Sequence, residues 1–304
     1  MAWRSYVDLR IVRDDGEELN MSDRPDAGWF LPSGSLDGFA ELDLTVETFD
    51  NVLSDGSTLV SRRVEEKDRT VEGARWIGNG ADAARASAVS FFSPRHSFEA
   101  HLAYRGRTRW CEGVLTGFRC EANNLNSPPE LTFTLLCPDP WMRGEDDHSE
   151  AFTDARAGFG FPFVSHAREP RNDGSRVPPG FPVSTLYYDG AGRVYNGGDV
   201  PCRYRIRCEF VAPAKNPVFT HDGRFVKVAD AFEAGDVLEV DFEAAPPRVT
   251  KNGADCIHLC TRDSSFVGME MAVGENRFGY ACDGDGNLGA MRVAVLHTER
   301  FTGV

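Results

Sequence analysis

The stretch Cys202-Arg203-Tyr204-Arg205-Ile206-Arg207-Cys208-Glu209-Phe210 alternates apolar and charged residues without interruption. Successive side chains of a β-strand point to opposite faces, so every second residue lies on the same side. One face of this stretch therefore carries only Cys, Tyr, Ile and Phe side chains, and the other carries arginines and a glutamate. This pattern predicts a strand with one face in a core and one face in water.

The same period of two recurs along the chain. Leu42–Phe49 contains the run Leu-Asp-Leu-Thr-Val-Glu, and Leu238–Glu243 repeats the pattern, so both are predicted as half-buried strands. The dipeptide Asn252-Gly253 is a hairpin signal, because both residues tolerate the positive φ angles of a tight turn. Further strands are predicted at Tyr6–Val12, Thr70–Ile77, Phe98–Tyr104, Arg109–Phe118, Leu131–Cys137, Arg248–Thr250, Cys256–Leu259 and Arg292–His297.

One segment has the character of a helix. Ala81–Phe92 is rich in alanine, the best helix former, and Ser93-Pro94 follows it as a stop signal. Its apolar positions Ala84, Ala88, Phe91 and Phe92 fall on one face. The predicted fold is mainly β with one α-helix.

The chain has 304 residues, which is the length of two ordinary domains. Pro138-Asp139-Pro140 and the charged run Glu145-Asp146-Asp147 mark a predicted boundary, giving domains 1–145 and 146–304. Residues 158–190 are rich in Gly and Pro and lack periodicity, so long loops are expected there. Short antiparallel strands with one polar face favour a β-sandwich in the second domain.

Composition excludes several classes. The formal net charge of −14 argues against stable nucleic-acid binding, which requires cationic contacts to phosphate. No stretch has the roughly 18–20 uninterrupted apolar residues of a membrane span, and the N-terminus lacks the pattern of a signal peptide, so we expect folding in a cytoplasm. Eight cysteines without a C-x-x-C pair are interpreted as reduced thiols acting as small apolar residues in strands.

Two segments resemble metal sites. Cys256, His258 and Cys260 share one face of a predicted strand, but a second ligand pair with zinc spacing is lacking, so we expect core positions. Residues 283–287 read Asp-Gly-Asp-Gly-Asn, like the start of a calcium loop, but Leu288 and Ala294 occupy the Gly and Glu positions of an EF-hand. We expect a hairpin turn there, between Phe278–Cys282 and Met291–Val295.

No nucleophile elbow, P-loop or H-E-x-x-H motif occurs, and the seven histidines are scattered. The sequence therefore predicts no catalytic, cofactor-binding or metal-binding residue. Exposed aromatic side chains could stack on sugars, which leaves a carbohydrate-binding adhesion module as the alternative function. The candidates are Trp29, Trp76, Trp110, Trp141, Tyr187, Tyr188 and Tyr195.

Several runs carry a resemblance to a known family. Residues 110–116, with Trp110 and Gly113 ahead of apolar alternation, and residues 130–141, Glu-Leu-Thr-Phe-Thr-Leu-Leu-Cys-Pro-Asp-Pro-Trp, resemble the end of the N-terminal domain of siphophage distal tail (Dit) proteins. Residues 195–201 and 235–241 are similar to the entry and a strand of that family's second domain. Residues 38–57, Arg69, the helix ending in Phe91-Phe92 and the terminal residues 301–304 follow in the family's order.

This resemblance implies a structural virion protein of the phage tail tip, assembled in the host cytoplasm. It implies an N-terminal, split-barrel-like domain that forms a homohexameric ring and a C-terminal sandwich similar to galectins or carbohydrate-binding modules. The implied partners are the tail tube protein, the baseplate hub or tail-associated protein, the tape measure protein and receptor-binding proteins. No cofactor and no enzymatic activity are implied. A tail-associated hydrolase, or a ring protein of a tailocin or gene-transfer agent, stays open as an alternative.

The acidic composition suits such a ring. Six copies, each with a charge of −14, would carry −84, and an acidic lining would repel DNA that passes through. We therefore expect acidic residues along a channel, although the sequence does not indicate which ones.

Overall fold

The computed structural model describes residues 6–51, 55–121, 127–151, 154–157, 186–283 and 287–304. The chain divides into two compact units. Unit 1 comprises Met1–Asp147, Gly198–Val200 and Thr298–Val304, and unit 2 comprises His148–Gly197 and Pro201–His297. The described elements are mainly strands with one α-helix, which confirms the predicted fold class. The bounds of the two predicted domains, 1–145 and 146–304, and the ring-forming role of the first stay predictions.

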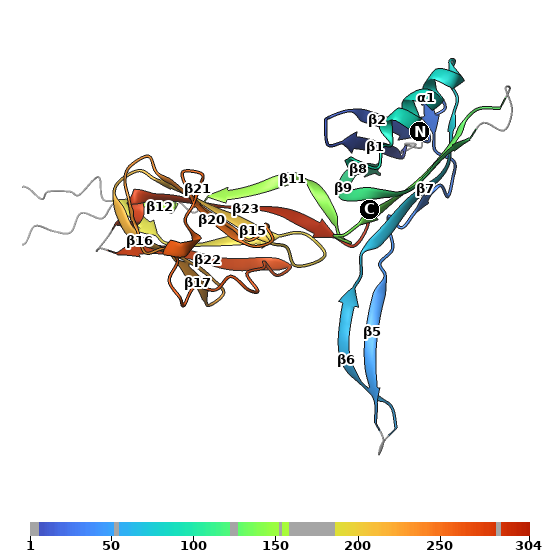
Figure 1. The fold of residues 1–304 in the computed structure, drawn as a ribbon. Coiled ribbons are helices and arrows are strands. Elements are labelled where there is room, and N and C mark those ends of the chain that lie inside the picture. The colour runs from blue at the N-terminus through green and yellow to red at the C-terminus, as the bar shows by residue number, and fades with distance from the viewer. Residues whose placement is uncertain (1–5, 52–54, 122–126, 152–153, 158–185, 284–286) are drawn as a thin grey trace, which may run out of the picture. The chain divides into compact units, whose positions relative to one another are not determined.

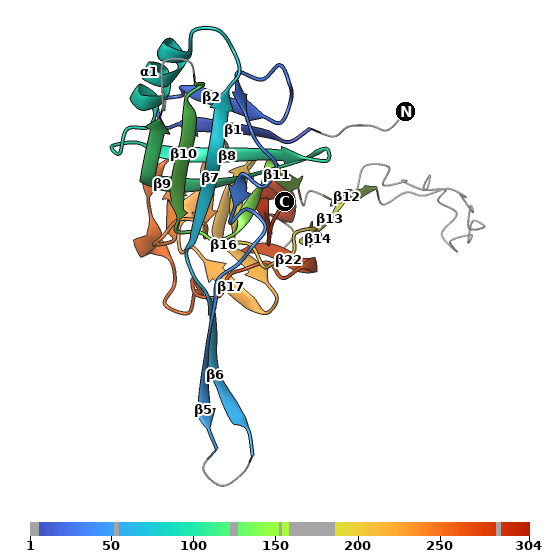
Figure 2. The same ribbon diagram turned by 90° about the vertical axis from the view of Figure 1, so that its right-hand side faces the viewer.

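Unit 1 is built around a closed circuit of seven strands. In circuit order these are β1 (Asp8–Arg13), β2 (Glu18–Ser22), β3 (Trp29–Phe30), β7 (Lys67–Trp76), β10 (Glu130–Cys137), β9 (Arg107–Glu121) and β8 (Ser97–Tyr104). The pairs are antiparallel except for β2 and β3, which run parallel. A short strand, β4 (Leu36–Asp37), also pairs with β7. Figure 2 shows β7, β9 and β10 side by side.

The alternation of residues along each strand explains which side chains fill the barrel interior. In β10 every second residue from Leu131 to Cys137 is buried, and β1 buries Leu9 and Ile11 in the same way. The apolar faces of all the strands thus meet in one core. Because the circuit closes, β7, β8, β9 and β10 each have hydrogen-bonded neighbours on both sides.

Helix α1 (Ala81–Phe91) starts after Gly80, which has a φ of +73°, and ends just before Ser93-Pro94. Its buried residues are Ala84, Ala88 and Phe91, as predicted. Phe92 follows the helix, and its ring lies 4.5 Å from the Phe133 ring, measured between centroids. The Phe92 ring also contacts those of Phe91, Phe98 and Phe118, so the helix is fastened to β8, β9 and β10.

The prediction of a half-buried strand at Leu42–Phe49 is correct about the strand and wrong about its burial. The segment forms β5 (Leu44–Asp50), which pairs with β6 (Ser57–Val64), but all seven residues of β5 are exposed. The two strands form a sheet of their own, which projects from the barrel strands in Figure 1 and Figure 2. The alternation is present, but no second layer among the described residues covers its apolar face.

Unit 2 is a β-sandwich. One sheet contains β14 (Ala191–Asn196), β22 (Gly274–Asp283), β16 (Ala214–His221), β17 (Arg224–Lys227) and β18 (Ala231–Phe232). The other contains β15 (Tyr204–Phe210), β19 (Val237–Asp241), β20 (Arg248–Lys251), β21 (Ala254–Asp255) and the unit 2 part of β23 (Met291–Phe301). Their inner faces share one core. The strict alternation predicted from Cys202 to Phe210 is confirmed, because Tyr204, Ile206, Cys208 and Phe210 are all buried.

Two local predictions in this unit are wrong. Residues predicted as a strand at Cys256–Leu259 instead form a 3₁₀ turn, η1 (Ile257–Leu259), directly after the Asn252-Gly253 hairpin. The segments around Asp283 were predicted to form a hairpin, but β22 and β23 belong to different sheets. The connection therefore crosses the sandwich, through η2 (Asn287–Ala290), and residues 284–286 lie outside the described part.

Three other strands complete the order: β11 (Met142–Ala151), β12 (Asp154–Ala157) and β13 (Leu186–Asp189), the last two paired with each other. The charged run 145–147, expected at a domain boundary, lies inside β11. Most of the Gly- and Pro-rich stretch 158–190 lies outside the described residues. Among the residues that the structure does describe, no helix has the length and apolar character needed to cross a membrane.

We predict that Phe92→Ala lowers the free energy of unfolding by about 3–5 kcal/mol, because it removes a ring in contact with four others. Denaturant unfolding measures this change. Val89→Ala is the matched control on the same helix, since Val89 is 46% exposed, and should change the value by less than about 0.5 kcal/mol. Equal effects of the two substitutions would contradict the role assigned to Phe92.

A buried polar network in unit 2 leads to a second prediction, which concerns the pH dependence of stability. His221 Nδ1 lies 3.0 Å from the Tyr204 hydroxyl, and Nε2 lies 3.5 Å from Oδ1 of Asn276. Oδ1 of Asn276 also accepts the Ala272 N–H, so it is an acceptor, and Nε2 of His221 carries the proton. Burial lowers the pKa of His221, which keeps the ring neutral.

A folded-state pKa below the unfolded value means that the unfolded chain binds the proton more tightly. Stability should therefore fall as the pH drops below about 6.5, the unfolded pKa of histidine. His221→Gln removes this ionisation and should flatten the pH dependence of unfolding measured between about pH 7.5 and pH 5. His258→Gln, at an exposed position, is the control and should leave the wild-type dependence unchanged.

Candidate interaction surfaces

The β5–β6 hairpin has two chemically different faces. Leu44 pairs with Val64, and Thr48 pairs with Leu59, and residues directly opposite each other share a face. Val46 lies between Leu44 and Thr48 in the alternation, so it belongs to the same side. We define the apolar face as Leu44, Val46, Leu59 and Val64; the same side also carries Arg62, opposite Val46, and Asp50, opposite Ser57.

The other face is polar and internally bonded. The Thr45 hydroxyl donates to Glu65 Oε1 at 2.6 Å, and the Ser61 hydroxyl donates to Glu47 Oε2 at 2.9 Å. These contacts bond Thr45, Glu47 and Ser61, and Arg63 lies on the same face, opposite Thr45. Phe49, at 63% exposure, is the exception on this side.

The apolar face lies open. Leu44 is 65% exposed, Val46 57% and Leu59 55%, and Val60, the extra residue of a β-bulge, is 63% exposed. A two-stranded ribbon is only marginally stable in water without a layer against it. Burying each of these side chains is worth about 1.5–3 kcal/mol. The hairpin is therefore built to be covered by another surface, and it is the main candidate interaction surface.

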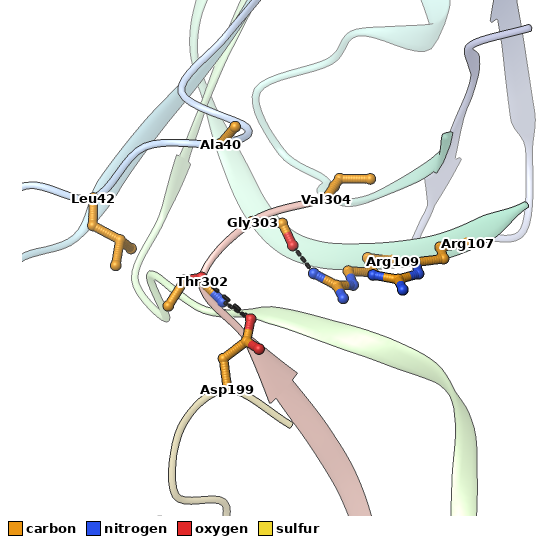
Figure 3. Close-up of a pocket in the computed structure, with 8 residues that line it drawn as sticks. All are labelled: Ala40, Leu42, Arg107, Arg109, Asp199, Thr302, Gly303 and Val304. Carbon is orange, nitrogen blue, oxygen red and sulfur yellow. Dashed lines mark hydrogen bonds between the residues drawn. The ribbon is translucent and has the colours of Figure 1, made fainter. Parts of the chain in front are cut away.

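A cavity of about 450 Å³ lies in unit 1. It is lined by Ala40, Leu42, Arg107, Arg109, Asp199, Thr302, Gly303 and Val304 (Figure 3). Its polar groups are already bonded inside the unit. The Arg109 guanidinium donates to the Gly303 carbonyl and stacks 3.6 Å from the centre of the Phe301 ring. The Asp199 carboxylate accepts the backbone N–H and the hydroxyl of Thr302, both at 3.2 Å.

These contacts hold residues 301–304 against β9. Burial lowers the pKa of Arg109, while the Asp199 charge opposes that effect. The carboxylate of the lining, Asp199, and its hydroxyl, Thr302, are bonded to each other. The cavity is best interpreted as a structural feature of unit 1.

The structure separates the residues considered for metal binding. Cys256 is buried and Cys260 is half-buried, on either side of the 3₁₀ turn, and His258 is exposed within the turn, so the three do not share a strand face. Burial raises the pKa of Cys260 to about 11, which disfavours the thiolate that a metal requires. Over the described ranges, no group of three or more His, Cys, Asp or Glu side chains is placed to hold a metal ion. All eight cysteines are free thiols, six of them buried.

The aromatic candidates for sugar stacking are mostly covered. Trp29 is buried, and Trp76, whose ring meets it edge-on at 5.5 Å, is half-buried, as are Trp110 and Trp141. Tyr195 is 63% exposed on β14. The side chains of Tyr187 and Tyr188 lie outside the described part. An isolated exposed ring does not make the aromatic platform expected of a sugar site.

Sequence reasoning missed the open face of the hairpin. The alternation of Leu44 and Val46 with polar residues is the same as in strands that are buried, so the pattern gives no sign of the missing layer. The acidic residues in or beside this hairpin are the signal that could have indicated its exposure. They are Asp43, Glu47, Asp50 and Asp55.

Residues 197–301 match the family model of the siphovirus-type tail component, C-terminal domain. No curated protein matches the chain. The structure of Dit from phage SPP1, described as a paradigm of the hub adsorption apparatus in phages that infect Gram-positive bacteria, is similar with a TM-score of 0.64. The identity is 15%, and the similarity covers 96% of this chain and 99% of that one.

The baseplate of phage p2 also contains a similar chain. In its activated conformation with Sr the TM-score is 0.54 at 8% identity, covering 98% of this chain and 99% of that chain. With Ca the TM-score is 0.50 at 9% identity, covering both chains fully. At such identities the likeness shows the fold. The chain thus has the fold of a phage tail and baseplate protein, and the predicted resemblance to the siphophage distal tail family is confirmed.

We predict that Val46→Lys weakens association between copies of the protein. Burying an ammonium group in an apolar contact costs more than about 1.4 kcal/mol, a tenfold loss in the association constant. Sedimentation velocity measures the share of associated protein. Thr45→Lys adds the same charge one residue away, on the polar face beside Glu65, and should leave association unchanged. Equal loss in both variants would show that the apolar face does not make the contact.

Proposed function

We propose that this protein is the distal tail hub of a long-tailed phage, a structural virion component at the tail tip. The observation that carries this proposal is the open apolar face of the hairpin on a closed barrel, in a chain with the fold of a phage hub protein. A barrel without free edges is a rigid body, and a hairpin with an uncovered face needs a second body to cover it.

In this proposal unit 1 associates head to tail with five further copies to close a homohexameric ring. Such a ring uses two different surfaces of each subunit, and it closes when the rotation between neighbours divides a full turn. The apolar face of the hairpin supplies one surface. The tail tube protein joins the ring on one side, and the baseplate hub or tail-associated protein and the tape measure protein join it on the other.

Unit 2 is proposed to carry the contacts toward receptor-binding proteins. Its match to the C-terminal domain of siphovirus-type tail components supports this role. The function is mechanical rather than catalytic, and the protein is assembled in the host cytoplasm and then carried in the virion. Carbohydrate binding is not adopted as a second function, because Trp29, Trp76, Trp110 and Trp141 are buried or half-buried.

In this proposal DNA passes through the ring, and the acidic charge supports this part of it. Six copies at −14 each carry −84, which repels the phosphate backbone and prevents DNA from adhering. A channel lined mainly by arginine and lysine would contradict this part of the proposal.

The test is negative-stain imaging of the purified protein together with native mass measurement. We expect six-fold rings with six times the 33.6 kDa mass of the chain. Thr45→Lys should form the same rings, which controls for the added charge used in the hairpin variant. Monomers at every concentration, both alone and with purified tail tubes added, would rule out the ring.

A further inference from the structure

The outer face of the five-stranded sheet in unit 2 carries more cations than carboxylates. On each strand this face consists of the residues that alternate with the buried ones. Its charged residues are Arg193 on β14, Lys215 on β16, Lys227 on β17, and Glu275, Arg277 and Asp283 on β22. In the whole chain, by contrast, 47 Asp and Glu residues outnumber 33 Lys and Arg residues. The cationic face is therefore an exception on an acidic protein.

Two arginines of this face lie directly opposite each other. The register of β14 and β22 pairs Arg193 with Arg277. Like charges in directly opposed positions destabilise a sheet. Glu275 binds Arg193, with 2.9 Å between Oε1 and Nη1, whereas Arg277 makes no ion pair with any residue that the structure describes. Two neighbouring guanidinium groups thus share one carboxylate.

The other sheet of the sandwich neutralises its arginines internally. On the outer face of β15, Arg205 lies 3.0 Å from Glu243, and Arg207 lies 3.4 Å from Glu209. Both sheets belong to the same unit and both expose arginines, so an unpaired guanidinium is not a general property of its surface. An arginine without a carboxylate partner, opposed by a second arginine, is suited to bind an anionic group of another molecule.

The middle of the cationic face is shallow. Gly279 pairs with Ala191 on one side and with Thr220 on the other, so three small residues form one row across β14, β22 and β16. A Cβ on Gly279 would lie 2.6 Å from the Thr220 hydroxyl oxygen, so the glycine leaves no side chain above the sheet. Tyr195, which is 63% exposed, lies on the same face opposite Glu275. Tyrosine and arginine are the residue types enriched where proteins contact each other.

We infer that this face is a docking surface for an acidic segment of a partner protein, an inference that rests on the proposed role of unit 2 in contacting receptor-binding proteins. Arg277 and Arg193 donate charge-assisted hydrogen bonds to carboxylates of that segment. Tyr195 packs beside them. The partner's carboxylates supply the negative charge that the opposed arginines lack within the sheet.

Other anions are less suited to this face. Residues 158–185 of the chain itself carry Arg168, Arg171 and Arg176 against Glu169 and Asp173, so they offer no net negative charge. Nucleic acid is disfavoured because the chain carries a net charge of −14 and stable binding requires many cationic contacts to phosphate.

Binding of a labelled oligoglutamate peptide to the full-length protein, measured by fluorescence anisotropy, tests the inference. We expect binding that is lost as salt rises, because the Debye length falls from about 30 Å at about 0.01 M to about 3 Å at about 1 M. Arg277→Ala should weaken binding about tenfold. Arg207→Ala, which removes a paired arginine from the other sheet, is the matched control and should leave binding unchanged.

Charge reversal sharpens the test. Arg277→Glu should lose the oligoglutamate peptide and bind an oligolysine peptide more tightly than the wild type does. Absence of oligoglutamate binding by the wild type, or equal losses in Arg277→Ala and Arg207→Ala, would overturn the inference. Tighter binding of double-stranded DNA or inorganic polyphosphate, dependent on Arg277, would replace the protein partner by a phosphate ligand. A smaller assembly mass for Arg277→Glu would replace it by a second copy of this chain.

The ring is tested separately from the docking surface. Arg277→Glu should form the same six-fold rings as the wild type. Rings without peptide binding would overturn the docking surface and leave the ring in place. Peptide binding without rings would support the docking surface and count against the ring.

Stability gives a readout that needs no ligand. Arg277→Gln removes the charge opposed to Arg193 and keeps much of the side-chain length. The midpoint of its denaturant unfolding should therefore be no lower than that of the wild type. A lower midpoint would show that the Arg277 charge stabilises the sheet, which contradicts a charge kept for binding.

Discussion

The structure of unit 1 depends on the double pairing of one long strand. The first half of β9 pairs with β8, and its second half, from Val114 to Glu121, pairs with β10. A change of register near Thr116, where the ladder shifts between Leu115 and Gly117, lets the strand bend from one partner to the other. This one element closes the circuit, satisfies the edges of two strands and encloses the core on which α1 packs.

The closed barrel fixes the base of the β5–β6 hairpin. Five of the ten exposed large apolar side chains described in this unit lie on β5 and β6. The hairpin leaves the barrel after β4 and returns at β7, so its base is fixed by a rigid body while its faces stay accessible. That combination suits an element that reaches a neighbouring molecule.

The barrel also holds charge in two contrasting ways. Lys67 and Arg69 are both buried on β7. The Lys67 ammonium reaches Asp43 at 3.1 Å and Glu41 at 3.8 Å at the base of the hairpin, so its charge is balanced by exposed carboxylates. The Arg69 side chain is 1% exposed and donates from Nη2 to the Pro140 carbonyl at 2.8 Å. One buried cation is thus balanced by carboxylates at the surface, and the other donates to the backbone carbonyl of Pro140.

The sequence by itself determined the features that depend on neighbours along the chain. The alternation from Cys202 to Phe210, the alanine-rich helix and the Asn252-Gly253 turn all follow from local side-chain geometry, and the structure has each of them. The ordered runs between residues 38 and 304 were enough to indicate the family, because they combine many such local features.

Only the tertiary structure decided which alternating strand is covered. Leu44 and Val46 follow the same pattern as Leu238 and Val240, yet the first pair is exposed and the second is fully buried. Nothing in the sequence indicated that Arg69 lies inside the barrel or that Cys256 and Cys260 flank a 3₁₀ turn that contains His258. Burial depends on which segments, distant in sequence, come to lie against a residue, and a period of two along one strand carries no information about that partner.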